Sequence, residues 1–318
     1  MANTQNPATV WNAPNYVGEL FLAGQNQTPF LNMIGGLNGG KQVDSWDFAM
    51  DQNYSLEAVS SQQAITETES LTAPTAWTYV RAQEVNACQI YRQAVSLSYA
   101  RMSVTGGLKP VATGLMPAGN QPVISEKDFQ IQAALKQIAL QAEYNFLNGT
   151  YQQATGAGVA SKTNGLVTAC VGKNTVAAGA VDLSKALLDQ LLAEMAGNGA
   201  SFANMVALVN AFQLQAISDI WGYAPDDRNI GGVAVKKIVT DFCDIDVVYA
   251  PKMPTDTLLL ANIGLCAPVF LPVPKKGFLF YEDFGKTAAF EGGEVYGQIG
   301  LTYGYSYEHG TITGLTTS

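Results

Sequence analysis

The sequence ITETESLTAPTAWTYV, residues 65–80, is extended in character, half polar, and far from any apolar run that could form a core. It is rich in Thr, places Trp77 and Tyr79 near Pro74, and contains no lysine. The next run, VNACQIYRQAVSLSY at residues 85–99, alternates apolar and polar side chains, which is typical of a β-strand. Because an isolated hairpin is only marginally stable in water, these segments need something else to pack against.

The extended pattern reaches from Gln42 to about Ser103 without a glycine, and nothing within it supplies a third strand or a supporting helix. We therefore predict a long two-stranded projection over residues 41–103 that is not stable by itself. Glu67 and Glu69 are expected on a solvated edge of this projection, where charge discourages uncontrolled strand pairing.

Residues 1–40 form an uncharged segment rich in Asn, Gly and Pro, which only Glu19 interrupts. Such a segment cannot build a domain core, yet its scattered apolar side chains are too numerous for simple disorder. We predict an arm that lies along another body.

A helix over residues 126–148 is the clearest local signal in the chain. Ser125 followed by Asp128 resembles a capping box, and Gly149 stands where a C′ glycine belongs. At 1.5 Å per residue the helix is about 35 Å long, which indicates a structural backbone. Apolar residues recur at helical spacing, namely Phe129, Ile131, Leu135, Ile138, Ala142 and Phe146.

After a link of small residues the chain alternates helices and strands. Helices are expected over about residues 183–196 and 211–221, with a short buried strand starting at Met205. A Gly- and Tyr-rich β segment runs from Glu294 to Leu315. The remaining predicted strands are VAVKKIVT, IDVVYAP, TLLLANI and APVFLPV, so the fold class is α+β.

Composition points to a chain that associates. Charged residues make up 14% of the 318 residues, against about 25% in ordinary globular domains. Such a chain either hides surface against partners, which we favour, or has an exterior rich in Ser, Thr, Asn and Gln. The net charge of −9 and the scattered basic residues argue against sequence-specific nucleic-acid binding, although a loose contact on one face stays open.

Four cysteines, at positions 88, 170, 243 and 266, have no close pair and match no zinc or redox motif. They are expected to be buried thiols in a reducing compartment. The first residues lack signal-peptide features, and no stretch approaches the ~20 apolar residues of a membrane helix. We expect a soluble protein that is not exported.

Residues with possible chemistry form no catalytic constellation. His309 is the only histidine and has no identifiable nucleophile partner, so a turn or strand-end role is expected. GAGVASKT, residues 156–163, approaches a phosphate-binding loop, but Ser161 replaces the second required glycine and a helix precedes it where a strand should.

Two further patterns also favour structural roles. Asp244 and Asp246 have metal-like spacing, but on a strand they share one solvated face or pair with a lysine across the sheet. Tyr303, Tyr305 and Tyr307 are expected to pack on one face of a strand. We predict no enzyme, no cofactor and no metal site.

The order of these segments resembles the major capsid proteins of tailed bacteriophages with the Hong Kong 97 (HK97)-like fold. The similarity spreads over nearly the whole chain, and no single stretch is a catalytic signature. It rests on TPFLNMIGG at 28–36, residues 64–101, GNQPV before the long helix, LNGTYQ after it, IVTDF at 238–242, MPTDTLLL at 253–260 and HGTITGL at 309–315.

The resemblance implies a domain plan and a function. Residues 1–40 become an arm that clasps one neighbour, and 41–103 comprise an extended loop that lies across another, together with its flanking strands. Residues 104–162 form a peripheral domain with 126–148 as its spine helix, 163–268 an α/β axial domain, and 269–318 returning peripheral strands. Contacts between subunits are expected from Trp11, Phe21, Phe30, Leu31, Trp77 and Tyr79.

Such a protein is expected to form pentamers and hexamers of an icosahedral or prolate head around phage double-stranded DNA. Portal, scaffolding and decoration or minor capsid proteins are the implied partners. The virion, assembled in the bacterial host cytoplasm, is the implied location. Removing residues 2–35 is expected to leave soluble subunits that do not close shells.

Two departures from the best-known member of that family matter. No lysine occurs between Lys41 and Lys109, so we predict a shell without covalent cross-links through the loop. No long charged helical leader is present, which implies either a separate scaffold or prior cleavage. The alternatives are an encapsulin-like compartment and, less in keeping with the pattern, a β-rich hydrolase or sugar-binding module.

Overall fold

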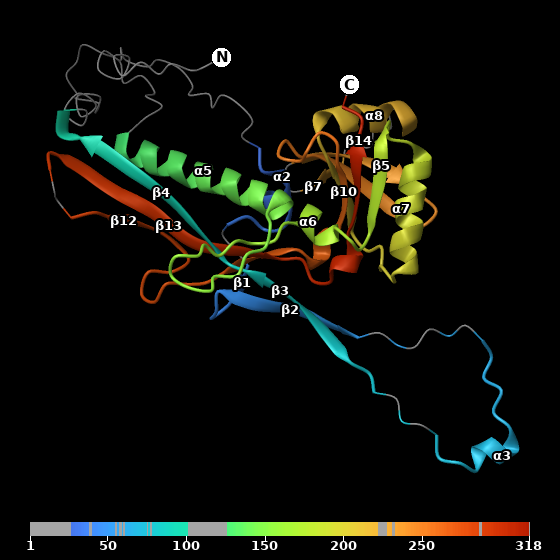
Figure 1. Cartoon of the computed structure of the whole chain (residues 1–318). Helices are drawn as coiled ribbons and strands as arrows, with labels where there is room; N and C mark the ends of the chain where they lie inside the picture. Colours follow the sequence, from blue (N-terminus) through green and yellow to red (C-terminus); the bar gives the residue numbers. More distant parts are fainter. Residues whose placement is uncertain are drawn as a thin grey trace.

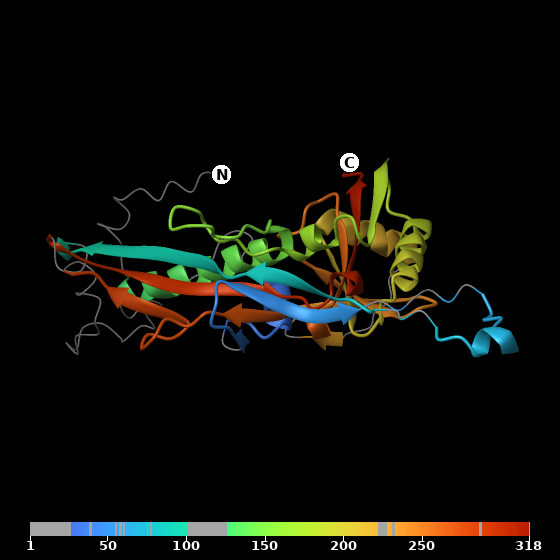
Figure 2. The ribbon, with the colours of Figure 1, turned by 60° about the horizontal axis from the view of Figure 1, so that its bottom comes forward.

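The computed structural model describes residues 27–317, apart from 38–39, 55, 57–58, 60, 75, 77, 101–125, 222–227, 231–232 and 286–287. Figure 1 shows three parts: an elongated layer of one long helix on strands, a thicker α/β body, and a loop that projects away from both. Figure 2 shows from a second direction that the loop extends away from the body.

The elongated layer is a five-stranded sheet built around β13 (Phe290–Thr302). One edge of β13 pairs antiparallel with β4 (Gln89–Ser98) over ten positions. The other edge pairs with β12 (Leu279–Asp283) and β11 (Ala267–Phe270), and β1 (Lys41–Gln42) adds to β11 in parallel.

Strand β4 therefore belongs to the body of the protein. The prediction that residues 41–103 form one long two-stranded projection is wrong over this part. The alternation of residues 85–99 indicated a strand correctly, but the partner, β13, lies about 200 positions away in the sequence. Local pattern gives no information on such a pairing.

Helix α5 (Glu126–Asn148) covers this sheet and has the bounds that the sequence predicted. Its buried face carries Ala134, Ile138, Ala142 and Phe146, at the three- and four-residue spacing of a helix stripe. Ser125, the proposed cap, lies outside the described residues.

Gly149 follows α5 for a different reason from the one predicted. Its backbone does not adopt the left-handed conformation of a C′ glycine. Instead, a Cβ at this position would lie 2.5 Å from the carbonyl oxygen of Thr163. The Gly165 N–H donates to the Gly149 carbonyl at 2.9 Å, so the glycine allows two segments to approach closely.

The α/β body is a seven-stranded sheet in the order β5-β14-β10-β6-β9-β8-β7. Helices α7 (Lys185–Gly197) and α8 (Ala211–Trp221) confirm the two predicted helices, and α6 (Leu166–Cys170) was not predicted. The strands are β5 (Thr175–Val181), β6 (Met205–Val209), β7 (Arg228–Ile230), β8 (Val233–Val239), β9 (Asp244–Tyr249), β10 (Leu258–Asn262) and β14 (Gly310–Leu315).

Two segments change sheets relative to the sequence-based plan. β14 was assigned to the returning peripheral strands, but it inserts between β5 and β10 of the seven-stranded sheet. β11, assigned in part to the α/β body, lies in the five-stranded sheet. Short 3₁₀ turns, Ile263–Leu265 and Ser306–Glu308, stand where the chain passes between the two sheets.

The central strands of the larger sheet join two hydrophobic cores. All five residues of β6 are buried, and so are all five of β10. Val206 and Leu208 face the core that contains α5, whereas Met205 and Val209 face the core beneath α7 and α8. Because one strand contributes to both cores, the α/β body and the elongated layer pack against each other.

The projection begins with β2 (Asp47–Tyr54) and β3 (Arg81–Ala87), which pair antiparallel, and α3 (Glu67–Ser70) lies between them. In the part of the chain that the structure describes, no helix combines the length and apolar character needed to cross a membrane.

Candidate inter-subunit interface

The loop between β2 and β3, residues 55–80, is the largest part of the described chain without a core. Large apolar side chains among its described residues are exposed to solvent: Leu56 is 68% exposed, Val59 95%, Ile65 66%, Leu71 84% and Val80 75%. An exposed run of this kind marks a surface that is covered by another molecule. Tyr79, one of the predicted contact residues, is 54% exposed here, and Trp77 lies outside the described residues.

The tip of the loop has local order despite its exposure. The Thr66 hydroxyl accepts a hydrogen bond from the Glu69 N–H at 3.2 Å, and the Glu69 carboxylate accepts one from the Thr66 N–H at 2.9 Å. This capping box starts α3. The hydrogen bonds that the Glu69 carboxylate accepts from the Thr66 N–H and the Thr66 hydroxyl hold the pKa of Glu69 below its usual value. Glu67 and Glu69 are exposed on the projecting loop, as expected for a solvated position, but they lie in a helical turn.

The root of the loop, in contrast, is tied to the body by Asn86 of β3. Its buried amide nitrogen donates to the Leu301 carbonyl at 2.7 Å and to the Asn164 carbonyl at 3.2 Å. Its oxygen accepts from the Asn164 N–H at 2.7 Å. One side chain therefore connects β3 to β13 and to the segment that follows α5.

A second tie joins the loop root to the α/β body. The Lys173 ammonium contacts both the Glu84 carboxylate of β3 and the Ser306 hydroxyl. It also lies 5.5 Å from the centre of the Tyr307 ring. Ser306 is fully buried. The root of the loop is therefore fixed to both parts of the body.

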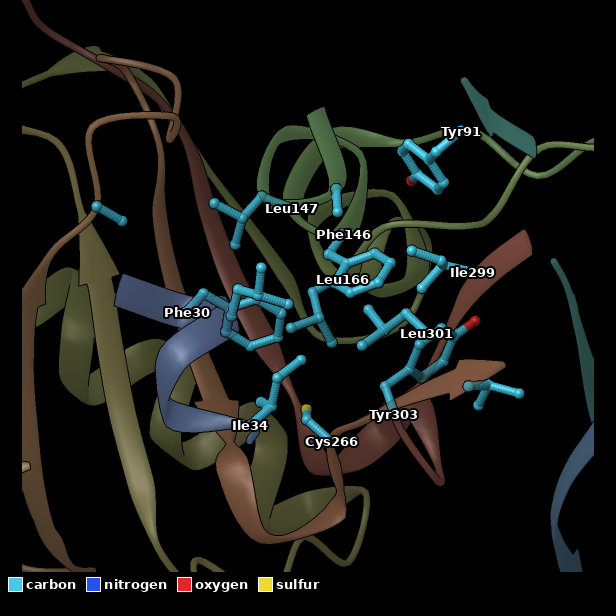
Figure 3. Packing of buried hydrophobic residues seen from close by; sticks show 14 of the residues in the cluster. Phe30, Ile34, Tyr91, Phe146, Leu147, Leu166, Cys266, Ile299, Leu301 and Tyr303 are labelled. Atoms are coloured by element: carbon cyan, nitrogen blue, oxygen red, sulfur yellow. The ribbon is translucent and has the colours of Figure 1, made fainter. Parts of the chain in front are cut away.

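Phe30 and Leu31 are not available to a neighbouring subunit, so their prediction as inter-subunit contacts is wrong. Helix α2 (Pro29–Met33) buries Phe30 completely and leaves Leu31 only 2% exposed. Figure 3 shows the Phe30 ring beside Phe146, Leu147 and Leu166 in the main core. The other predicted arm contacts, Trp11 and Phe21, lie outside the described residues.

Glu143 of α5 is the reason why this segment folds inward. One carboxylate oxygen accepts the Phe30 N–H at 3.0 Å, and the other accepts the Leu31 N–H at 2.7 Å. These are the free N–H groups at the start of α2. Burial raises the pKa of Glu143 to about 7, against the opposing effect of the two hydrogen bonds and of Lys252.

Sequence reasoning missed Glu143, Asn86 and Lys173. A signal for Glu143 was present, because it is an acid beside Ala142 on the apolar face of α5 and one turn from Phe146. Asn86 and Lys173 carry no such signal, since their partners are distant in the sequence.

The remaining candidate residues have structural roles. His309 is fully buried. Its Nδ1 accepts the Asn262 N–H at 3.2 Å, and its Nε2 donates to the Tyr303 carbonyl at 2.8 Å. Burial lowers its pKa, which keeps the ring neutral. The expected Lys partner of Asp244 is confirmed as Lys237 across the β8–β9 pair.

The three tyrosines and residues 156–163 also form no functional site. β13 ends at Thr302 and Tyr305 precedes a 3₁₀ turn, so the three tyrosines do not share a strand face. Residues 156–163 follow α5 and a loop, not the strand that a phosphate-binding site requires, although the short α6 begins at Leu166. Within residues 27–317 as described, no group of three or more His, Cys, Asp or Glu could hold a metal ion.

Comparison with known proteins agrees with this architecture. The family model described as SU10 major capsid protein matches residues 3–316. No curated protein matches the chain. The capsid of cyanophage A-1(L) has a similar structure, with a TM-score of 0.64 and 15% identity over 96% of this chain and 97% of that one.

Two further structures have the same fold. The capsid of the native GTA particle gives a TM-score of 0.62 at 13% identity over 95% of both chains. The SrpI encapsulin of Synechococcus elongatus PCC 7942 gives 0.60 at 11% identity over 100% of this chain and 98% of that one. At such identities the likeness shows the HK97-like fold alone, which confirms the predicted fold class.

Proposed function

Because this chain belongs to the SU10 major capsid protein family, we propose that the exposed loop at residues 55–80 is completed by a neighbouring subunit in the phage shell. The chain is a major capsid protein, and it self-assembles in the virion. The observation that carries the proposal is the row of apolar loop side chains in solvent, from Leu56 to Val80, on a root fixed by Asn86 and Lys173.

The assembly follows from the geometry of this contact. A loop on one subunit that binds a different surface of the next gives a head-to-tail interface, and such interfaces close into rings. Pentamers and hexamers joined in an icosahedral or prolate head then enclose double-stranded DNA. The seven-stranded α/β body would face the ring centre as the axial domain, with β14 added to residues 163–266.

Other partners follow from the role of a shell protein. A portal protein, a scaffolding protein, and decoration or minor capsid proteins would bind the assembled lattice, and assembly would take place in the host cytoplasm. The DNA contact on the inner face would be non-specific, given the net charge of −9. The shell protein itself would act as a structural component without an enzymatic step.

The test is negative-stain microscopy of the expressed protein, alone and with the proteins encoded beside it. We expect closed shells for the full chain and none after removal of residues 56–79, with the shortened subunit still folded by circular dichroism. Shells that close normally without the loop would contradict the proposal. Packaged double-stranded DNA distinguishes a phage head from an encapsulin-like compartment.

The arm requires a different truncation from the one suggested by sequence. Removal of residues 2–35 would delete Phe30 and Leu31 from the core and unfold the subunit. Removal of residues 2–26 leaves α2 in place and tests the arm alone. We expect folded subunits that do not close shells.

The absence of lysine between Lys41 and Lys109 supports a shell held together without covalent bonds through the loop. Denaturing gel electrophoresis of mature particles is expected to show single chains. A ladder of linked chains would contradict this.

A further inference from the structure

Two segments that cross between the sheets lie against each other. One crossing, at Ile263–Leu265, joins β10 of the larger sheet to β11 of the smaller one. The other, at Ser306–Glu308, joins β13 to β14. Gly304 has a φ of +66°, and a Cβ at this position would lie 3.2 Å from Cβ of Leu265. The glycine therefore allows the two crossings to approach closely.

His309 bonds one crossing to the other. Its Nδ1 accepts the N–H of Asn262, the last residue of β10, at 3.2 Å. Its Nε2 donates to the carbonyl of Tyr303, the first residue after β13, at 2.8 Å. The Tyr303 and His309 rings meet edge to face, with their centres 6.1 Å apart. Residues 262–266 and 303–309 together are called the joint below.

The imidazole acts where the pairing of β10 with β14 ends. The ladder between these strands reaches Leu260 and Gly310, and the N–H of Asn262 lies beyond it. Asn262 is 3% exposed and His309 is fully buried. A buried N–H that loses its acceptor is costly, so the bond to Nδ1 stabilises the closed joint. This bond requires the tautomer that carries its proton on Nε2.

Protonation of the ring is incompatible with this arrangement. An imidazolium carries a proton on both nitrogens, so Nδ1 becomes a donor and faces the N–H of Asn262. The ring therefore either stays neutral or separates from Asn262. Burial lowers the pKa of His309, in keeping with a ring that is held neutral while the joint is closed.

The charged groups nearest the ring already have partners. Glu308 accepts the N–H of Ser201 at 3.0 Å and its hydroxyl at 2.6 Å, and Glu84 pairs with Lys173. Both carboxylates favour a charged imidazole, but the effect of burial on the pKa of His309 is larger. The other ionisable side chains that border the joint are Asp51, Cys170, Cys266, Tyr303 and Tyr307. Burial raises the pKa of both thiols, so they do not titrate in acid.

We propose that His309 is an acid-sensitive contact between the two crossings: when the ring takes up a proton, its bond to Asn262 breaks and the joint opens. Opening is local, because the two cores on either side contain no part of this bond. It allows the α/β body to shift relative to the elongated layer. The inference goes beyond the proposed function, since it concerns the single subunit.

The pH range follows from the ordinary pKa of histidine, 6.5, which the ring regains when the joint opens. The pKa in the closed joint is lower, so the open form binds more protons. Closure is therefore fully favoured above pH 6.5 and weakens as the pH falls toward the lower value. The open fraction should rise by up to about tenfold between pH 7.5 and pH 5.5.

Hydrogen–deuterium exchange of the dissociated subunit, corrected for the intrinsic pH dependence of amide exchange, tests the opening. The readout must be local, because Glu143, with a pKa of about 7, titrates in the same range. We expect peptides over residues 258–266 and 303–311 to lose protection by up to about tenfold from pH 7.5 to pH 5.5. The peptide over α7 should keep its protection. An equal loss in α7 would overturn the local opening.

His309→Gln is the matched variant, because its amide is neutral at both pH values. The joint peptides of this variant should exchange faster than those of the wild type at pH 7.5 and show no further gain at pH 5.5. If the variant keeps the pH dependence of the wild type, His309 is not the group that responds to acid.

Nitrogen NMR of the wild type tests the contact without any substitution. His309 is the only histidine, so the ring signals of histidine-labelled protein belong to it. At pH 7.5 we expect the neutral tautomer with its proton on Nε2. A proton on Nδ1 would contradict the bond from Asn262 and overturn the proposal.

The shift of the α/β body is measured by the distance between two spin labels. Ala94→Cys on β4 and Ala177→Cys on β5 place one exposed label in each sheet. Cys243→Ser removes the partly exposed thiol, and the other three cysteines are buried. The distance distribution should change between pH 7.5 and pH 5.5 in the wild type but not in His309→Gln. An unchanged distribution in the wild type would overturn the shift.

These experiments are separate from the test of the proposed function. They are made on dissociated subunits, whereas the shell function is tested by the closure of shells. A joint that stays closed at pH 5.5 would overturn the role of His309 and leave the shell function intact. Failure to form shells would leave the exchange and distance measurements valid.

Discussion

Helix α2 and the projecting loop look alike in sequence but differ in what completes them. Both are apolar segments outside any periodic core pattern, and both were expected to contact a neighbouring subunit. Phe30 of α2 is fully buried in the subunit's own core, whereas Leu71 of the loop is 84% exposed. Glu143 makes the difference, because it satisfies the backbone N–H groups of α2 that would otherwise be buried without partners.

The comparison teaches that apolar content does not identify an interface. A segment folds inward when the body offers both apolar contacts and hydrogen-bond partners for its backbone. The loop has a capping box at Thr66 and a fixed root, but its described residues between them form no backbone hydrogen bond to the body. Its described apolar side chains are therefore exposed in the single subunit, and we propose that a neighbouring subunit covers them.

The largest expected effect comes from Phe30→Ala. It would leave a cavity beside Phe146 and lower the free energy of unfolding of the dissociated subunit by about 3–5 kcal/mol. Urea denaturation measures it. Leu71→Ala is the matched control and should change the value by less than about 0.5 kcal/mol. Equal effects would remove the distinction between the two segments.

Lys173→Met should lower the free energy of unfolding by about 1–3 kcal/mol, as measured by urea denaturation. The substitution leaves the Glu84 carboxylate of the loop root without its cation in a partly buried site. One Glu84 oxygen already has no partner among the described residues. Lys276→Met breaks the more exposed pair with Glu282 and should cost no more than about 1 kcal/mol. A similar loss of unfolding free energy in both variants would contradict a stabilising role of the Lys173–Glu84 contact at the loop root.

Glu143 predicts a dependence of stability on pH. Its pKa is about 7 in the folded subunit against an ordinary 4.5, so the native state holds more protons between these values. The contribution of this group to stability is therefore present below pH 4.5 and is lost as the pH rises through 7. The stability of the wild type relative to Glu143→Gln should fall by about 1–3 kcal/mol between pH 5 and pH 8. Urea denaturation of both proteins at the two pH values measures this change. If the difference in unfolding free energy between wild type and Glu143→Gln is the same at pH 5 and pH 8, the raised pKa of Glu143 is contradicted.

The smallest effect on the subunit should come from Ile65→Ser combined with Leu71→Ser. Both side chains are exposed, so the unfolding free energy should move by less than about 0.5 kcal/mol. The yield of closed shells should nevertheless fall, because the neighbour loses its apolar contacts. Light scattering measures shell assembly, and urea denaturation measures the stability of the subunit. A variant that loses stability but assembles normally would contradict the prediction.

The sequence alone determined the features that depend on neighbouring residues. The 3.6-residue period of Ile138, Ala142 and Phe146 placed α5 within its observed bounds, and the alternation of residues 85–99 identified the strand at residues 89–98. The exposure of the loop followed from the same local evidence, since residues 65–80 contain no pattern that could bury them within the segment.

Tertiary structure decided which distant segments meet. Glu143 and Phe30 lie 113 positions apart, and Asn86 and Leu301 lie 215 apart. The same holds for β4, which joins β13, and for β14, which crosses into the larger sheet. Periodicity reports which face of an element is apolar, but the identity of the covering partner depends on the packing of the whole chain, which a local pattern does not encode.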